Sequence, residues 1–166
     1  YVPDTVERQA RQLVERHLAG EPVAYLIGEW EFYGLPLDIS ERVLIPRPDT
    51  EVLAAAVIEG LRGAESPRVL DLCSGCIGLA VAKNVPGSHV VLGEIDEGAL
   101  RVCRQNIRRT GLSGQAVSMQ LNALEKAPPR LGEFDCIVSN PPYIPDGDIA
   151  GLDPSVRDYE PHLALK

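Results

Sequence analysis

The residues best suited to chemistry form a short loop after the apolar segment 134–139. They are Asn140, Pro141, Pro142 and Tyr143. Two prolines fix two φ angles and remove two backbone N–H donors, so the Asn140 side chain and the Pro141 carbonyl can both be presented as acceptors in a rigid loop. The Tyr143 ring adds a flat surface for stacking. Such a loop would hold a planar amide or amino group by its two N–H bonds, which an ordinary turn rarely needs.

A second candidate is the small-residue segment 71–78, which reads Asp-Leu-Cys-Ser-Gly-Cys-Ile-Gly. Ser74, Gly75 and Gly78 let a backbone turn tightly and approach a ligand closely, as nucleotide-binding loops do. The segment is not a Walker loop and does not complete a Gly-x-Gly-x-x-Gly pattern. On these residues alone, a nucleotide loop and a plain turn from strand to helix are both possible.

An acidic residue, Glu94, follows about twenty residues further on, at the end of another apolar run. A carboxylate at such a place can accept two hydrogen bonds from ribose hydroxyls. Glu94 by itself would be taken as a solvated charge. The loop and the acid together favour a ligand of the adenosine type.

Hydrophobic periodicity predicts an α/β fold that positions these residues at one edge of a sheet. Continuous apolar runs separated by helices indicate a parallel sheet covered by helices on both faces, with ligands bound beyond the carboxyl ends of the strands. The expected strands are 68–73, 90–95, 116–121 and 134–139, and the expected helices between them are 79–83 and 97–109. Upstream we expect a helix over 4–18 capped by Asp4, a hairpin of two or three strands within 24–39, an extended stretch over 43–48, and a helix over 50–61 capped by Asp49 or Thr50.

Length and composition narrow the class of protein. A chain of 166 residues, 45% of them hydrophobic, fits one globular domain and excludes a large multidomain enzyme. The net charge of −8 disfavours non-specific binding to nucleic acid or to anionic membranes. No apolar run approaches the ~20 residues of a membrane span and no signal peptide is visible, so we expect a cytoplasmic protein. Cys73 and Cys76 lack further ligands nearby in the sequence, so no metal site is expected.

Taken together, the Asn-Pro-Pro-Tyr loop, the glycine-bearing loop and the acid after the second strand resemble class I S-adenosylmethionine-dependent methyltransferases that modify planar nitrogens. The segments that narrow the resemblance are 21–28 (Glu-Pro-Val-Ala-Tyr-Leu-Ile-Gly), 31–35 (Glu-Phe-Tyr-Gly-Leu), 44–51 (Leu-Ile-Pro-Arg-Pro-Asp-Thr-Glu) and 157–161 (Arg-Asp-Tyr-Glu-Pro). With them the sequence is similar to the peptide chain release factor glutamine methyltransferases. Nucleic-acid adenine methyltransferases share Asn-Pro-Pro-Tyr but not the Pro-Arg-Pro at 46–48.

The resemblance implies a Rossmann-like class I methyltransferase that moves a methyl group from S-adenosyl-L-methionine to the side-chain amide nitrogen (N5) of the glutamine in the Gly-Gly-Gln loop of a class I release factor. It implies that Asn140, Pro141, Pro142 and Tyr143 act in catalysis and bind the substrate together with Arg47. The implied cofactor-binding residues are Asp71, Cys73, Ser74, Gly75, Glu94, Ile95, Asn122 and Asn140. The implied parts are the last helix of an amino-terminal helical domain (1–20), a hairpin linker (21–48) and a catalytic domain (49–166) without the family's carboxyl-terminal strands.

Three departures from the family pattern keep other interpretations open. The family usually reads Asp-Leu-x-Thr-Gly-Ser-Gly, so two residues are absent between Cys73 and Ser74, and Asn122 stands where the family commonly has an acid. The third is that the chain stops at Lys166, where the family continues. The shortened loop and the missing strands suggest a non-catalytic binding module as one alternative. A nucleic-acid adenine-N6 methyltransferase is the other, with Arg101, Arg104 and Arg108 on one helix face. We expect a release factor as partner, with no membrane and no direct nucleic-acid binding.

Overall fold

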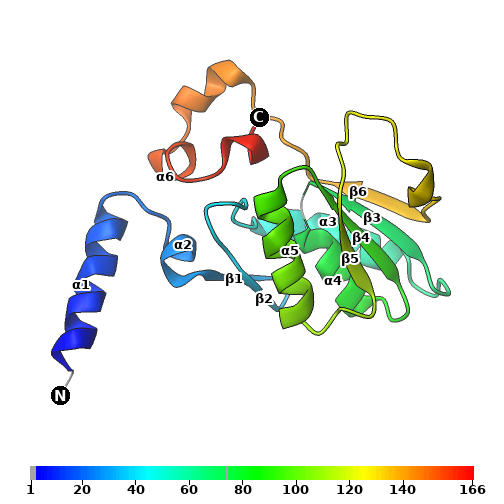
Figure 1. The fold of residues 1–166 in the computed structure, drawn as a ribbon, viewed down its shortest axis with the longest axis horizontal. Coiled ribbons are helices and arrows are strands. Elements are labelled where there is room, and N and C mark those ends of the chain that lie inside the picture. The colour runs from blue at the N-terminus through cyan, green and yellow to red at the C-terminus, as the bar shows by residue number, and fades with distance from the viewer. Residues whose placement is uncertain (1–2, 74) are drawn as a thin grey trace.

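A four-stranded parallel sheet forms the centre of the protein (Figure 1). The computed structural model describes residues 3–73 and 75–166. The strands are β3 (Arg68–Leu72), β4 (His89–Glu94), β5 (Ala116–Gln120) and β6 (Cys136–Ser139), in the spatial order β5-β4-β3-β6. Leu70 of β3 pairs with Val91 on one side and with Ile137 on the other. The predicted parallel α/β sheet is confirmed, and each strand lies within a residue or two of its expected range.

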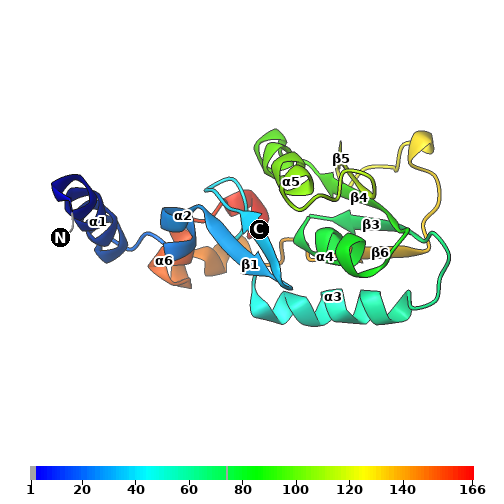
Figure 2. The same ribbon diagram turned by 90° about the horizontal axis from the view of Figure 1, so that it is seen from below.

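Three helices pack against this sheet: α3 (Pro48–Gly60), α4 (Cys76–Asn84) and α5 (Glu97–Arg109) (Figure 2). Their buried side chains form one core cluster with alternate residues of the strands, which include Val69, Val90 and Val138. The positions in between point to the opposite face, where Val117 and Ile137 are 55% and 63% exposed. In the described residues the three long helices therefore cover one face, whereas the sequence predicts helices on both. Apolar residues at both faces of a strand do not reveal which face is covered.

The amino-terminal part consists of α1 (Asp4–Leu18), α2 (Val23–Ile27) and a hairpin of β1 (Glu29–Phe32) and β2 (Leu35–Asp38). The predicted hairpin is confirmed with two strands, and residues 23–27 before it form a helix that the sequence did not predict. Pro22 precedes this short helix and Gly28 ends it with a left-handed φ of 77°. The side chains of Asp4, Asp49 and Thr50 do not cap helices: Pro3 precedes α1, and Arg47 precedes α3 with Pro48 at its first position.

The hairpin is attached to α5. The buried Asn106 side chain accepts a hydrogen bond from the Asp38 N–H at 2.6 Å and donates to the Asp38 carbonyl at 3.0 Å. Arg109 forms ion pairs with Glu29 and Asp38. These contacts link the hairpin to α5 and through it to the sheet.

Before β6 the chain forms one short helix, η1 (Pro129–Leu131), and after β6 it forms three more: η2 (Asp146–Gly151), α6 (Pro154–Arg157) and η3 (His162–Ala164). The stretch 154–166 returns toward the β1–β2 side of the sheet (Figure 1). Within the described ranges, no helix is long and apolar enough to cross a membrane.

Candidate active site

The carboxyl ends of three adjacent strands bring the predicted site residues together. Leu72 pairs with Gly93 of β4 and with Ser139 of β6, so the residues that follow these three positions lie along one edge. The Cys73 N–H donates to the Gly93 carbonyl at 3.0 Å, and the Ser139 hydroxyl donates to the Leu72 carbonyl at 2.9 Å. The small-residue loop, Glu94 and the Asn140 loop are therefore neighbours, although they are far apart in the sequence.

The small-residue loop is a tight connection. Strand β3 ends at Leu72 and α4 begins at Cys76, so only residues 73–75 join them. Ser74, a predicted cofactor-binding residue, lies outside the described residues. On either side of it the backbone is left-handed, with φ of 67° at Cys73 and 69° at Gly75. For cysteine this conformation costs roughly 1–2 kcal/mol. A Cβ on Gly75 would lie 3.0 Å from the Cys103 sulfur, so glycine suits this position for two reasons.

Asp71 connects the end of β3 to the start of α4 by a hydrogen bond. It is fully buried, and its Oδ2 accepts a hydrogen bond of 2.6 Å from the Gly78 N–H in the first turn of α4. Gly78 itself allows α4 to lie against the sheet, because an added Cβ would be 2.4 Å from a methyl carbon of Leu92. The aspartate therefore positions the start of α4, and a direct contact with a cofactor stays a prediction.

The thiols near the loop are protonated and so are not available as bases. Burial raises the pKa of Cys73 and of Cys76, so both keep their protons at neutral pH. Among the residues that the structure describes, no group of three or more His, Cys, Asp or Glu side chains could hold a metal ion. This edge of the sheet therefore offers oxygen acceptors and backbone groups.

The Glu94 carboxylate is held in a fixed orientation at the end of β4. Its Oε1 accepts hydrogen bonds from the N–H groups of Ile95 at 2.7 Å and Asp96 at 2.9 Å. These bonds fix the orientation of the carboxylate, and Oε2 accepts none from the described residues. The Ile95 side chain beside it is exposed. Glu94 thus presents one preoriented, charged oxygen next to an apolar surface.

Asn122 lies after β5 and is occupied within its own loop. Its Oδ1 accepts from the Leu124 N–H at 3.0 Å, and its Nδ2 donates to the Glu125 carboxylate at 2.9 Å. A cofactor contact from this residue stays a prediction.

The Asn140 loop opens into a cavity of about 310 Å³ between β6, α3 and the end of the chain. Its lining residues are Leu44, Arg47, Asp49, Thr50, Leu53, Asn140, Pro141, Tyr143, Ile144, Val156, Ala164 and Leu165. The half-buried Asn140 contacts the Thr50 hydroxyl through Nδ2 at 3.5 Å, which leaves Oδ1 as an acceptor. The structure therefore places three of the four loop residues and Arg47 around one cavity, whereas Pro142 is not among its lining residues.

Two parts of this cavity are not predicted by the sequence. Thr50 and Asp49 were expected only as helix caps, yet both line it. The carboxyl-terminal residues close it, since the Leu165 carbonyl accepts from the N–H groups of Tyr143 at 3.2 Å and Ile144 at 2.9 Å. Tyr143 itself is 78% exposed, so its ring forms a rim of the cavity. In the sequence, the motif at 157–161 was the one feature that pointed to a role for these carboxyl-terminal residues.

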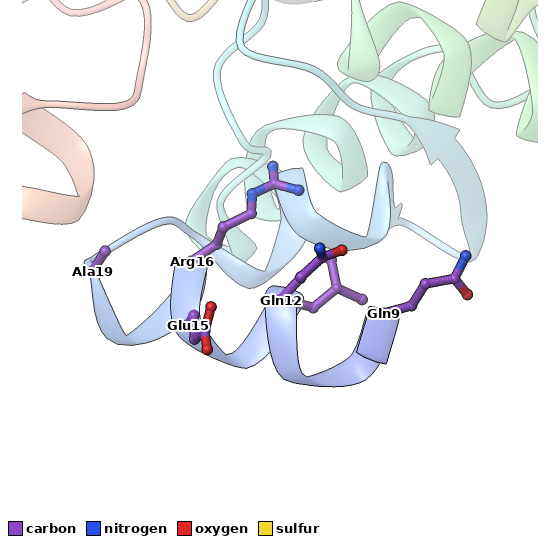
Figure 3. Close-up of a pocket in the computed structure, with 6 residues that line it drawn as sticks. Gln9, Gln12, Glu15, Arg16 and Ala19 are labelled. Atoms are coloured by element: carbon purple, nitrogen blue, oxygen red, sulfur yellow. The ribbon is translucent and has the colours of Figure 1, made fainter. Parts of the chain in front are cut away.

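A second, larger hollow of about 670 Å³ runs along α1 (Figure 3). Its lining side chains belong to α1 and the residue after it, and include Gln9, Gln12 and Arg16. No residue of α1 is buried. Helix α1 lies well away from the carboxyl ends of the strands in both views (Figures 1 and 2), so this hollow is separate from the candidate site.

Comparison with known proteins identifies a methyltransferase family and curated relatives. Residues 49–151 match the methyltransferase small domain family. The release factor glutamine methyltransferase of Chlorobaculum tepidum is 42% identical over 164 residues, which is 93% of this chain and 56% of the relative. That of Geobacter sulfurreducens is 44% identical, over 93% of this chain and 53% of the relative. The chain thus spans about half the length of these curated relatives.

Solved structures show the same fold at low sequence identity. A human methyltransferase 10 domain containing protein matches with a TM-score of 0.54 at 22% identity, over 68% of this chain and 56% of its own. The N-terminal domain of human METTL16 in complex with SAH matches with a TM-score of 0.51 at 20% identity, over 69% and 49%. The resemblance to release factor glutamine methyltransferases is confirmed by the relatives, and the chain belongs to the methyltransferase small domain family.

Proposed function

We propose that this protein transfers a methyl group from S-adenosyl-L-methionine to the side-chain amide nitrogen (N5) of the glutamine in the Gly-Gly-Gln loop of a class I release factor. The observation that carries the proposal is the rigid Asn140–Pro141 acceptor pair, which lines a cavity at the same carboxyl edge of the sheet as Glu94, with β3 between their strands. The names of the curated relatives support the same substrate. Residues 49–166 would form the catalytic domain, residues 1–20 the end of a helical domain and residues 21–48 a linker. The protein would act in the cytoplasm.

The residues at the sheet edge fit this cofactor. Oε2 of Glu94 would accept from the ribose hydroxyls, Ile95 would lie against the adenine ring, and the backbone around Gly75 would approach the methionine part. When bound, the cofactor supplies an electrophilic methyl group on a sulfonium. The product is S-adenosyl-L-homocysteine.

The chain's own task is to align a poor nucleophile. The lone pair of an amide nitrogen is delocalised into its carbonyl group. Asn140 Oδ1 and the Pro141 carbonyl would each accept one N–H of the glutamine amide and turn its nitrogen toward the methyl group. Good alignment can lower the activation free energy by roughly 7–11 kcal/mol. In the transfer the S–C bond would break as the N–C bond forms, and one amide proton would then be lost to solvent, so no thiolate or imidazole base is required.

Surface charges favour a protein substrate over a nucleic acid. Of the three α5 arginines that could contact phosphates, Arg101 and Arg104 are paired with Glu97, whereas Arg108 forms no ion pair with the described residues. The net charge of −8 repels a phosphate backbone. A neutral glutamine side chain avoids this repulsion.

Transfer of tritium from labelled cofactor tests the proposal. We expect label in a purified class I release factor, none in the same factor with its Gly-Gly-Gln glutamine replaced, and only modest inhibition by salt. A nucleic-acid enzyme would instead label DNA or RNA and lose binding steeply with salt, with a log–log slope near −0.9 for each phosphate contacted on duplex DNA. Label in nucleic acid with none in the intact release factor would reject the proposal. No label in either, with no cofactor binding by calorimetry, would indicate a non-catalytic module.

A further inference from the structure

A buried carboxylate lies behind the candidate substrate cavity. The Glu160 side chain is 2% exposed, and it forms an ion pair with Arg47, 113 residues away in the sequence. Its second oxygen accepts a hydrogen bond from the Ile45 N–H at 3.2 Å. A buried charge is costly unless it is paired and hydrogen-bonded, and Glu160 meets both conditions through Arg47 and Ile45.

The ion pair fixes a side chain that faces the cavity. Arg47 lies between Pro46 and Pro48, which restrict its backbone, and it directly precedes α3. Its side chain is 39% exposed and lines the same cavity as Asn140. Glu160 therefore holds the guanidinium from the buried side, while the open side of the group faces the space where a substrate would enter.

The Arg47 guanidinium keeps donors for a substrate. Its Nη2 donates to Glu160, and its remaining N–H groups meet no acceptor among the described residues. The charge is compensated by Glu160, and Asp49 adds a further negative charge to the cavity lining. A phosphate would be repelled by this balance. A neutral carbonyl oxygen of a peptide backbone is the acceptor that fits.

We propose that Glu160 is a positioning residue that orients Arg47 to bind a backbone carbonyl of the glutamine-bearing loop, next to the amide site at Asn140. This rests on the proposed function, because it assigns the loop of the same substrate. Glu160 acts only through Arg47. Loss of its charge should therefore weaken substrate binding and leave the cofactor site unchanged.

Binding of release factor separates this role from a purely structural one. We would measure the dissociation constant by fluorescence anisotropy with S-adenosylhomocysteine present, together with KM and kcat, for Glu160→Gln, Arg47→Lys and the double variant. We expect Glu160→Gln and Arg47→Lys each to weaken binding and raise KM about tenfold, with kcat within about twofold. The double variant should bind no more weakly than Arg47→Lys. Cofactor affinity should stay at the wild-type value.

Asp158→Asn is the matched control, because Asp158 lies two residues away and its ion pair with Arg157 is exposed. It should bind like the wild type. Glu160→Gln with binding within twofold of the wild type, or losses that multiply in the double variant, would overturn the inference. If Glu160→Gln does not fold, the test rests on Arg47→Lys, because unchanged release factor binding by Arg47→Lys also overturns the inference. A wild type that binds the release factor without methylating it rejects the proposed function only, and one that does neither rejects both.

Discussion

Replacement of Glu94 by glutamine probes the cofactor site with the least structural disturbance. Oε1 accepts the N–H groups of Ile95 and Asp96 at 2.7 and 2.9 Å, and a glutamine carbonyl oxygen can keep both bonds. The substitution then changes only the outer atom, from the charged oxygen Oε2 to an NH₂ group. An NH₂ group cannot accept the ribose hydroxyls. The fold should therefore survive while a charged acceptor is lost.

The size of the effect follows from the bonds that are lost. Hydrogen bonds to a charged group contribute about 1.5–3 kcal/mol, which corresponds to roughly a 10- to 150-fold change in dissociation constant. Glu94 is only half-buried, so water partly replaces the lost bonds. We therefore expect Glu94→Gln to weaken binding of S-adenosylhomocysteine by about tenfold, near the lower end of that range.

Isothermal titration calorimetry measures this change directly. Glu97→Gln is the control, because Glu97 lies three residues away on α5 and pairs with Arg104 on the surface. The control should bind the cofactor product like the wild type. If Glu94→Gln binds within twofold of the wild type and keeps its melting temperature, the ribose role of Glu94 is refuted and the residue only organises the start of α5.

Three further predictions address other parts of the site. Asn140→Ala should keep cofactor affinity within a few-fold but lower turnover in the tritium assay at least about a hundredfold, since its acceptor matters when the amide is aligned; near-normal turnover would contradict this. Gly78→Ala should lower the unfolding free energy in urea by about 1–3 kcal/mol because its Cβ would lie 2.4 Å from Leu92, whereas Gly114→Ala, with open space around it, serves as the unaffected control. Burial raises the pKa of Cys103 to about 12 from an ordinary value of 9.0, so at pH 9 the folded thiol stays protonated, and iodoacetamide should alkylate it at least about tenfold more slowly than in the unfolded chain. The same shift destabilises the fold as pH rises from 9 toward 12, because the unfolded thiol releases its proton first.

The sequence by itself was sufficient to predict the sheet and to place most of the candidate site residues at its carboxyl edge. The apolar runs that became β3, β4, β5 and β6 are local patterns, and helices between them require parallel pairing. Parallel strands align their carboxyl ends, so the residues after each run could be placed together without coordinates. The prolines at 141 and 142 restrict the backbone whatever surrounds them, which is why the acceptor loop was recognisable.

Tertiary structure alone decided the features that depend on distant partners. The short helix Val23–Ile27 was missed, because aromatic and β-branched residues favour strands locally and only packing overrides this preference. Which sheet face is covered was equally hidden, since Val117 and Ile137 are as apolar as the buried strand residues. Glu160 carries no local sign that it binds Arg47, because pairing across 113 residues depends on how the whole chain folds. Periodicity reports only neighbours along the chain, and a buried ion pair is defined by neighbours in space.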